Sequence, residues 1–433
     1  MRTTRRRFLK GMTFAASAGS LPFLVPRTSL ADDDAELAQR LAADLARHAG
    51  FGDKFSGGPG DLATADWGAG RLRTAGYRVA ESPFDAPFFV RRSVRLTTGG
   101  TTSDVIPQAP VVVTGRRGVT APLALVEGRV GDVRGRIALV VAPFARHSAL
   151  FLDTGIGKTV VAAAQAGAVA IVVVTTGPSG EAIALNAPEQ PFVPVPMAVL
   201  APKNAPPFVA AARAGEVGTL VLDGDATPRP CKNVVARLER GDRWVAISTP
   251  RSGWFGCVGE RGTGTAAFLE LAAWAGARFP ELSVFLMNTG GHEYFFAGSH
   301  RVLHEAPGPE VTLAWAHVGA TLAAKSAELR DGKLTMLETA DPNRSLMSTA
   351  AARGAAAEAF KGLEGLAEPV AVQPNAGELS TFTDLGYSKA FAVLGRHAWF
   401  HTPQDTLECV DAKLLVPVVR AHQRAIELLI RSG

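Results

Sequence analysis

Residues 282–300 read LSVFLMNTGGHEYFFAGSH. The stretch begins with an apolar run, 282–287, which has the length of one buried strand. A polar turn marked by two glycines follows, and it places His292 and Glu293 just beyond the end of that strand. Imidazole and carboxylate groups together are the ligands that suit zinc. The stretch therefore predicts a buried strand that delivers two chemically active side chains at its carboxyl end.

The chain around this stretch alternates strands and helices from Cys231 to the C-terminus. Several of the strands are continuous apolar runs, which is typical of a parallel sheet covered by helices on both faces. The pattern predicts an α/β fold with a mixed, mostly parallel sheet. We expect strands at 233–238, 244–248, 282–287, 311–316, 333–338 and 389–394, and helices at 263–275, 345–360 and 412–430.

The segment before Cys231 has a different character. Residues 36–76 show helical periodicity and lead into a strand at 77–80. The next segment is rich in proline and glycine, with short strand-like runs and one helix near Lys158, and it predicts a separate β-rich insert. We therefore divide the chain into a signal peptide at 1–31, an N-terminal part of the main domain at 32–104, the insert at 105–228 and the rest of the main domain at 229–433.

The charge of the chain is concentrated at its start. The 433 residues carry a formal net charge of +5, but the first 31 residues contain six basic residues and no acid, so the remainder carries −1. This distribution argues against a nucleic-acid partner. Arg5 and Arg6 precede a moderately apolar stretch and small residues ending at Ala31, which resembles a twin-arginine signal cleaved after that alanine. We expect export to the periplasm or the exterior; a basic N-terminal arm is the alternative.

Later segments predict neither a membrane span nor a disulfide framework. The longest apolar run, 160–176, contains Gln165 and divides into an alanine-rich helical half and a β-branched half, so no stable membrane insertion is expected. Cys231, Cys257 and Cys409 are widely spaced and allow at most one disulfide; buried thiols are the simplest interpretation. Nothing in the sequence specifies an oligomeric state.

Polar side chains follow four of the expected strands in the main domain. In open α/β sheets, ligands gather beyond the carboxyl ends of the strands, so these side chains should meet at one edge. Their chemistry, imidazole with carboxylate, is that of a zinc site. The residues are Arg251, Glu260, His292, Glu293, His317, Arg396, His397 and His401.

Several motifs resemble those of the co-catalytic zinc exopeptidases, a family that includes aminopeptidases, glutamate carboxypeptidase, glutaminyl cyclase and the transferrin-receptor ectodomain. These motifs are NVVARL at 233–238, GTGTAAFLELA at 262–272, GS at 298–299 and HTPQDT at 401–406. The insert resembles the protease-associated domain through DVRGRIALV at 132–140 and the segment from Lys158 through 162–174. The resemblance covers most of the chain and implies the fold. It does not by itself imply activity, because the family includes receptors that have lost catalysis.

Carried onto this chain, the family pattern implies a remodelled metal site. Thr249 and Arg251 stand at the positions of the family's His-x-Asp motif, so one of its two zinc ions has lost a ligand. The resemblance implies a single zinc ion held by Glu260, Glu293 and His401.

The same comparison implies roles for neighbouring side chains. His317, at the position of a later family aspartate, is a fourth ligand or a group beside the ligands. His292, which replaces the family's base glutamate, is the expected acid or base. Glu378 could hold a cationic amine, and Arg251 or Arg396 could hold an anionic group of the substrate.

These residues also have structural interpretations. His292 and Glu293 could form an ordinary surface turn, and His317 could be a hydrogen-bonded core histidine. His401 could start a helix. Glu260 could favour a helix N-terminus, with Arg261 as its solvated neighbour.

The expected function is hydrolysis of a peptide or small amide with one zinc ion. A catalytically inactive peptide- or protein-binding homologue is one alternative. A single-zinc acyltransferase or lyase related to glutaminyl cyclase is the other.

Overall fold

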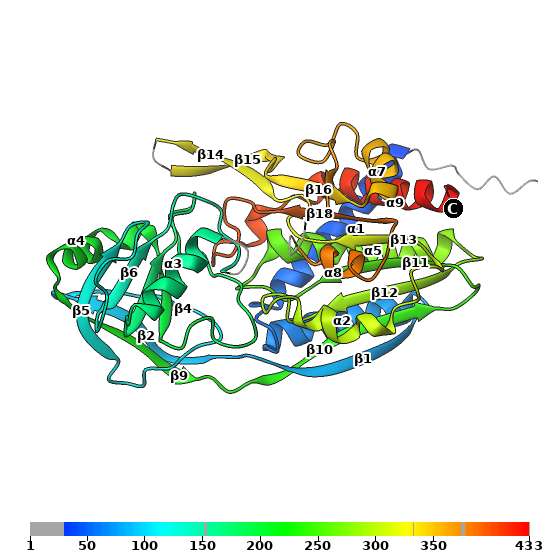
Figure 1. Cartoon of the computed structure of the whole chain (residues 1–433). Coiled ribbons are helices and arrows are strands. Elements are labelled where there is room, and N and C mark those ends of the chain that lie inside the picture. Colours follow the sequence, from blue (N-terminus) through cyan, green and yellow to red (C-terminus); the bar gives the residue numbers. More distant parts are fainter. Residues whose placement is uncertain (1–29, 151–153, 332, 374–376, 433) are drawn as a thin grey trace, which may run out of the picture.

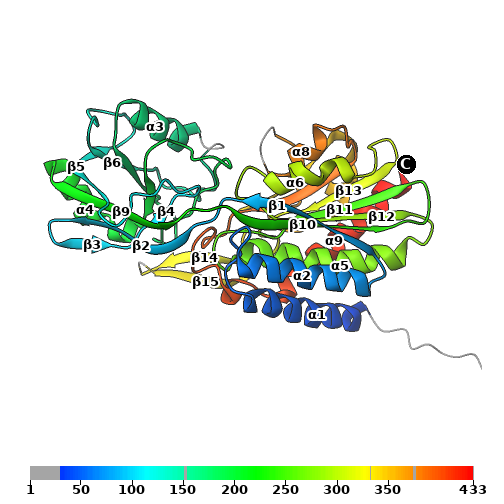
Figure 2. The ribbon, with the colours of Figure 1, turned by 90° about the horizontal axis from the view of Figure 1, so that it is seen from below.

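The computed structural model describes residues 30–150, 154–331, 333–373 and 377–432. Within these ranges the chain forms two eight-stranded sheets that lie next to each other, each covered by helices (Figures 1 and 2). The expected signal peptide lies almost entirely outside the described residues, so export stays a prediction. Among the described residues, no helix combines the length and the apolar character that a membrane crossing requires.

The larger sheet belongs to the main domain and has the order β1-β10-β12-β11-β13-β18-β16-β17. Its centre is parallel, because β11 pairs in parallel with β12 and β13, and β13 pairs in parallel with β18. Antiparallel pairs join β1 to β10, β10 to β12 and β16 to β18. The strands are β1 (Arg78–Ala86), β10 (Arg229–Leu238), β11 (Trp244–Pro250), β12 (Ser283–Thr289), β13 (Thr312–Val318), β16 (Arg344–Ser348), β17 (Val370–Ala371) and β18 (Ala390–Gly395).

Helices cover both faces of this sheet, as Figure 2 shows. On β11, Val245 and Ile247 enter the core beneath the long helices, whereas Ala246 enters the core on the opposite face. Because successive residues of a strand point to opposite faces, both positions are apolar in a doubly covered sheet. One face carries α1 (Leu30–Gly50), α2 (Pro59–Thr74), α5 (Thr263–Arg278), α7 (Arg353–Ala359) and α9 (Ala412–Arg431); the other carries α6 (Ala297–Val302) and α8 (Leu379–Thr383).

The second sheet has the order β3-β2-β9-β5-β6-β7-β8-β4. The helix α3 (Thr154–Gln165) packs on one face and α4 (Pro206–Ala214) on the other. This sheet takes in β2 and β3, which precede the boundary expected at residue 105. Its strands are β2 (Val90–Thr98), β3 (Thr101–Ser103), β4 (Ile106–Pro107), β5 (Val119–Val126), β6 (Ile137–Val141), β7 (Ala170–Val174), β8 (Met197–Leu200) and β9 (Val217–Asp225).

Two chain segments that run side by side connect the sheets. The chain passes from β1 in the main sheet to β2 in the second sheet, and it returns from β9 to β10. Because β1 pairs with β10 and β2 pairs with β9, the outgoing and returning segments are neighbours on both sides of the junction (Figure 1).

Two expected elements differ in the structure. The strand expected at 333–338 is β15 (Lys333–Ala340), which pairs with β14 (Lys325–Arg330) in a separate hairpin and not in the main sheet. The helix expected at 345–360 begins only at Arg353, because the preceding residues form β16. The polar residues Arg344, Ser345 and Ser348 weaken the apolar signal of β16, and the alanine-rich sequence that follows extends the helical pattern towards it.

Candidate functional site

A cavity of about 700 Å³ lies at the carboxyl ends of the parallel strands. The main domain contributes side chains from the ends of β11, β12, β13 and β18, as the sequence predicts. The second sheet contributes the loop after β6 and the segment before β8, so the cavity is bounded by both parts of the molecule. Its lining includes Glu260, Arg261, His292, His317 and Arg396 from the main domain, and Arg146, His147, Ser148 and Asn186 from the insert.

Glu260 lies in a wide helical turn, η2 (Val258–Gly262), immediately before α5. The carboxylate of Asp405 accepts hydrogen bonds from the backbone N–H groups of Gly259 and Glu260, at 2.6 and 3.0 Å, and thereby caps this turn. The side chain of Glu260 is fully buried. Its Oε1 atom lies 2.8 Å from the guanidinium group of Arg261, and its Oε2 atom has no hydrogen-bond partner.

Two opposing effects act on the pKa of Glu260. Burial disfavours the charged form, but the positive charge of Arg261 and the hydrogen-bond contact with His401 favour it and lower the pKa to about 2. Glu260 is therefore an anion at neutral pH. Arg261, which the sequence suggested as a solvated neighbour, is 1% exposed and is the cation next to this carboxylate.

His401 faces Glu260 from the loop after β18. Its Nδ1 atom lies 2.8 Å from the backbone carbonyl of Ala184 in the insert, so that nitrogen carries a proton and donates it. The other ring nitrogen, Nε2, lies 3.2 Å from Glu260 Oε1. In neutral imidazole Nε2 is an acceptor, so it would face another acceptor across this distance. A proton or a metal cation at Nε2 removes the repulsion.

Glu293 is buried at the end of β12. Its Oε2 atom accepts a hydrogen bond of 2.7 Å from the hydroxyl group of Ser56, whereas Oε1 has no partner. Its backbone carbonyl accepts a hydrogen bond from the N–H group of Ala187 in the insert. An unpaired carboxylate oxygen away from water is costly, so it marks a position where a cation or water would be stabilised.

His292 is paired with a carboxylate. Its Nδ1 atom lies 3.1 Å from Glu378 Oε2, which fixes the proton on Nδ1 and leaves Nε2 as an acceptor. Burial raises the pKa of Glu378, but the hydrogen bonds from His292 and Ser299 lower it to about 2. Glu378 therefore stays charged and holds the His292 ring in one orientation.

His317 lies at the end of β13, next to the same carboxylate. Its Nδ1 atom lies 2.9 Å from Ser248 Oγ, and its Nε2 atom lies 3.8 Å from Glu378 Oε2. Burial lowers the pKa of His317 to about 4, although the charge of Glu378 opposes the shift. The imidazole is therefore neutral at physiological pH and has the protonation state that a metal ligand requires.

Comparison with solved structures places this arrangement in a known fold. A peptidase precursor from Shewanella amazonensis matches with a TM-score of 0.69 and 18% identity, covering 92% of this chain and 96% of that chain. A zinc aminopeptidase from Bacillus subtilis matches with 0.67 and 16%, covering 89% and 94%. An aminopeptidase from Aneurinibacillus sp. matches with 0.65 and 18%, covering 91% and 95%. The chain has the zinc-aminopeptidase fold.

The zinc-aminopeptidase fold confirms the architecture expected from the sequence motifs. At these identities the likeness establishes the fold and leaves the activity to be argued from the site. A scan against models of protein families finds no match, and a search of curated protein sequences finds none either. The resemblance of the insert to a protease-associated domain stays a prediction.

Not every site residue expected from the sequence faces the cavity: Glu293 and His401 are buried and are not among the residues that line it. Arg251 is fully buried outside the cavity lining, where its Nε atom lies 2.9 Å from Asp61 Oδ1. Glu378 is also buried, and it is occupied by His292 and by hydroxyl donors, so it is not presented to a substrate amine. Arg396 is exposed and lines the cavity, where it can contact an anionic group.

The expected zinc ligands reach the same edge of the sheet without forming a compact group. His401 and Glu260 are in contact, whereas the donor atoms of Glu260, Glu293 and His401 do not all lie within 4.8 Å of one another. Over the described residues, the trio that meets this limit is His397, Asp405 and Cys409, of which the sequence suggested only His397 as part of the site edge.

Proposed function

We propose that this protein hydrolyses a peptide or related amide bond with the help of one zinc ion held by Glu260, Glu293 and His401. The observation that carries the proposal is the orientation of His401. The backbone carbonyl of Ala184 fixes the proton on Nδ1, so Nε2 is directed at the buried carboxylate of Glu260. A histidine that ligates a metal typically has its second nitrogen bound to such a carbonyl.

The types of donor atom that these three residues offer are suited to zinc. Two carboxylates and one imidazole are a common zinc-binding combination, and Glu260 Oε2 and Glu293 Oε1 are buried oxygens without hydrogen-bond partners. The three donors have to draw closer together for the ion to bind, and the ion would compete with Arg261 for Glu260. When bound, zinc would supply Lewis-acid polarisation of the substrate carbonyl.

His292 is suited to act as the general base. It lines the cavity, and its bond to Glu378 places the proton on Nδ1, which leaves the lone pair on Nε2. A general base needs this tautomer and a fixed orientation. Glu378 acts through His292 and is a positioning residue. This pairing of imidazole and carboxylate would replace the single carboxylate base that the family resemblance leads one to expect.

The cavity favours a substrate that carries a negative charge. Arg146, Arg261, Arg344 and Arg396 all line it. Arg146 is paired with Asp341 at 2.8 Å and Arg261 is paired with Glu260. Arg344 Nε donates to the backbone carbonyl of Glu364, and Arg396 Nη1 donates to the backbone carbonyl of Arg146 at 3.2 Å, so neither of these bonds engages a carboxylate. Because guanidinium groups bind carboxylates through paired hydrogen bonds, we infer a peptide with an acidic side chain or a C-terminal carboxylate near the scissile bond.

Loss of catalysis is the second candidate. The guanidinium group of Arg261 supplies a permanent positive charge at 2.8 Å from Glu260, which would stabilise this carboxylate without a metal ion. On that interpretation the cavity binds a peptide and does not cleave it.

Zinc content and turnover together decide between the two candidates. We expect the Glu293→Gln variant to contain about one zinc ion fewer per chain than the wild type, by mass spectrometry of protein purified without chelator. Glu270→Gln, which changes a carboxylate paired with Arg40 near the surface, should retain the wild-type content. Wild type should cleave acidic aminoacyl or peptidyl anilides, and His292→Ala should lose this activity.

Two other results would each reject a part of this proposal. Equal zinc content in wild type and Glu293→Gln would overturn the metal assignment. Peptides that raise the melting temperature of the wild type without being cleaved would establish the binding protein in place of the hydrolase.

A further inference from the structure

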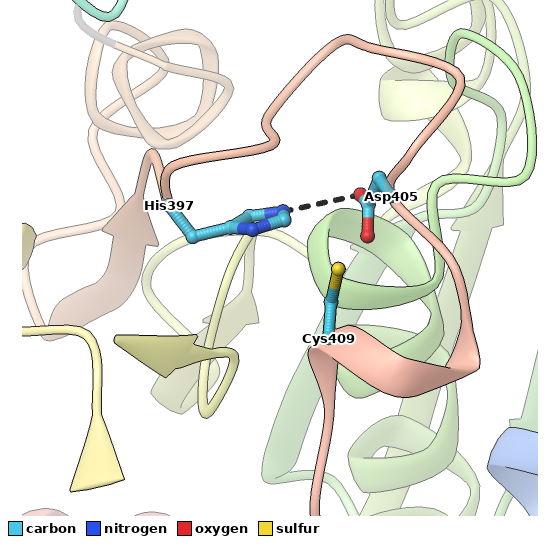
Figure 3. A group of neighbouring side chains, drawn as sticks. All are labelled: His397, Asp405 and Cys409. Carbon is cyan, nitrogen blue, oxygen red and sulfur yellow. Dashed lines mark ion pairs between the residues drawn. The ribbon is translucent and has the colours of Figure 1, made fainter. Parts of the chain in front are cut away.

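Three buried donor side chains meet behind the candidate active site. His397 follows β18, Asp405 lies in the next loop, and Cys409 ends the short helix η5 (Leu407–Cys409). Figure 3 shows the imidazole ring and the thiol group on the same side of the Asp405 carboxylate. One donor atom from each residue lies within 4.8 Å of the other two, and all three side chains are fully buried.

The hydrogen bonds of this trio are incomplete. His397 Nε2 lies 3.2 Å from Asp405 Oδ2, yet neither ring nitrogen of His397 has a partner in hydrogen-bonding geometry. A buried polar atom without a partner costs about 1–3 kcal/mol. The thiol group of Cys409 donates to the backbone carbonyl of Gln404 at 3.2 Å. The imidazole of His397 is therefore buried with both of its ring nitrogens unsatisfied.

We propose that His397, Asp405 and Cys409 bind a second zinc ion, which has a structural role. Imidazole nitrogen, carboxylate oxygen and thiolate sulfur are the three donor types that zinc accepts in proteins. The charges also agree, since one thiolate and one carboxylate neutralise Zn²⁺ and a neutral complex can be buried at little electrostatic cost. A magnesium or calcium ion would require oxygen ligands throughout.

The spacing suits a tetrahedral ion after a small contraction. Zinc lies about 2.0–2.3 Å from nitrogen, oxygen and sulfur ligands, so neighbouring donors in a tetrahedron are about 3.3–3.8 Å apart. The contact of 3.2 Å between His397 and Asp405 is already of this size. The backbone carbonyl of Gln404, at 3.2 Å from the sulfur of Cys409, is a neutral oxygen that can fill the fourth position.

The position of the trio explains what the ion would do. All three side chains are fully buried and none lines the large cavity, which suits the closed coordination of structural zinc sites. Asp405 already caps the turn η2, which carries Glu260, and the loop between His397 and Cys409 carries His401. The ion would therefore join the two segments that present the candidate catalytic ligands.

A sulfur ligand makes this site distinguishable from the proposed catalytic one, whose candidate ligands offer only nitrogen and oxygen. We would express the full chain in cobalt-supplemented medium and record its near-ultraviolet absorption, and we would measure zinc X-ray absorption on protein from ordinary medium. We expect a thiolate-to-cobalt charge-transfer band and a zinc–sulfur distance of about 2.3 Å. With both sites filled, the sulfur count should average about one half per zinc ion.

Matched cysteine variants locate the sulfur. Cys409→Ser should lose the band and about one metal ion per chain. Cys231→Ser should keep both, because Cys231 is a buried thiol whose hydrogen bond to Asp61 a serine can replace. A wild-type protein without sulfur bound to its metal overturns the proposal, even if Cys409→Ser does not fold. A band that survives Cys409→Ser also overturns it, whereas zinc bound by nitrogen and oxygen alone leaves the proposed hydrolase standing.

Discussion

Replacement of Arg251 by methionine should destabilise the main domain severely without acting through the cavity. The guanidinium group is fully buried, lies 2.9 Å from Asp61 Oδ1, and donates to the backbone carbonyls of Asn288 and Lys232. Removing one partner of a buried ion pair costs about 3–5 kcal/mol, because the other charge stays buried and unpaired. The two carbonyl groups add about 1 kcal/mol each. We therefore expect a loss of about 5–7 kcal/mol, against a typical total stability of about 5–15 kcal/mol.

Urea unfolding followed by tryptophan fluorescence measures this loss in the main domain. All six tryptophans, at positions 67, 244, 254, 274, 315 and 399, lie outside residues 87–228, so the signal reports on the sheet that Arg251 supports. Arg278→Met is the matched control. Its guanidinium group is half exposed and pairs with Glu427, and its loss should cost less than about 1 kcal/mol.

A double variant tests whether the unpaired charge of Asp61 causes this loss of stability. Asp61→Asn combined with Arg251→Met removes the unpaired charge, so the double variant should be more stable than Arg251→Met alone by about 2 kcal/mol. The reasoning is refuted if Arg251→Met costs no more than Arg278→Met. It is also refuted if the two effects simply add, because a coupled pair cannot behave in that way.

Two further predictions concern acid stability and substrate charge. Burial lowers the pKa of His422 to about 4, so its neutral form contributes stability above pH 6.5 that is lost as the pH falls towards 4. His422→Phe should reduce the slope of the free energy of unfolding against pH in this range by up to about 1.4 kcal/mol per pH unit, as measured by urea unfolding. An unchanged slope would contradict the assignment. Arg396→Ala should raise KM for an acidic peptide about tenfold relative to its neutral amide analogue, with kcat little changed; equal effects on both substrates would show that Arg396 does not contact the anionic group.

The sequence predicts the parallel centre of the main sheet well, because doubly covered strands leave continuous apolar runs. The run at 282–287 corresponds to β12 with a shift of one or two residues, and His292 and Glu293 follow it as expected. The sequence does not predict the strands β2 and β9. They pair with each other in the second sheet, and polar residues interrupt their apolar positions.

The sequence predicts which side chains reach this edge of the sheet better than it predicts the contacts that they make there. Sequence position brings His292, His317 and Glu260 to one edge, because strand direction fixes where each strand ends. The pairing of His292 with Glu378 depends on how α8 packs, which no local pattern encodes. The burial of Arg261 was missed for a similar reason. An arginine beside a glutamate is usually exposed, and the wide turn η2 directs both side chains inward.

The trio behind the site shows the same limit. His397, Asp405 and Cys409 are spaced by eight and four residues, which matches no compact zinc motif. They meet because the loop turns back at His401, whose backbone φ angle is +58°. A left-handed conformation at a histidine is unusual and has no reliable sequence signal.

Because the two segments that join the sheets are paired side by side, the insert could be deleted without disrupting the main sheet. Ala86 and Arg229 are directly opposite each other on β1 and β10, so the chain leaves the main sheet and re-enters it at one point. A tight turn could connect these residues without rethreading any strand of the main domain. The wall that the insert gives to the cavity can therefore change in evolution while Glu260, Glu293 and His292 stay in place. Access and selectivity would then vary with the insert, as long as the Ala184 carbonyl that orients His401 is kept.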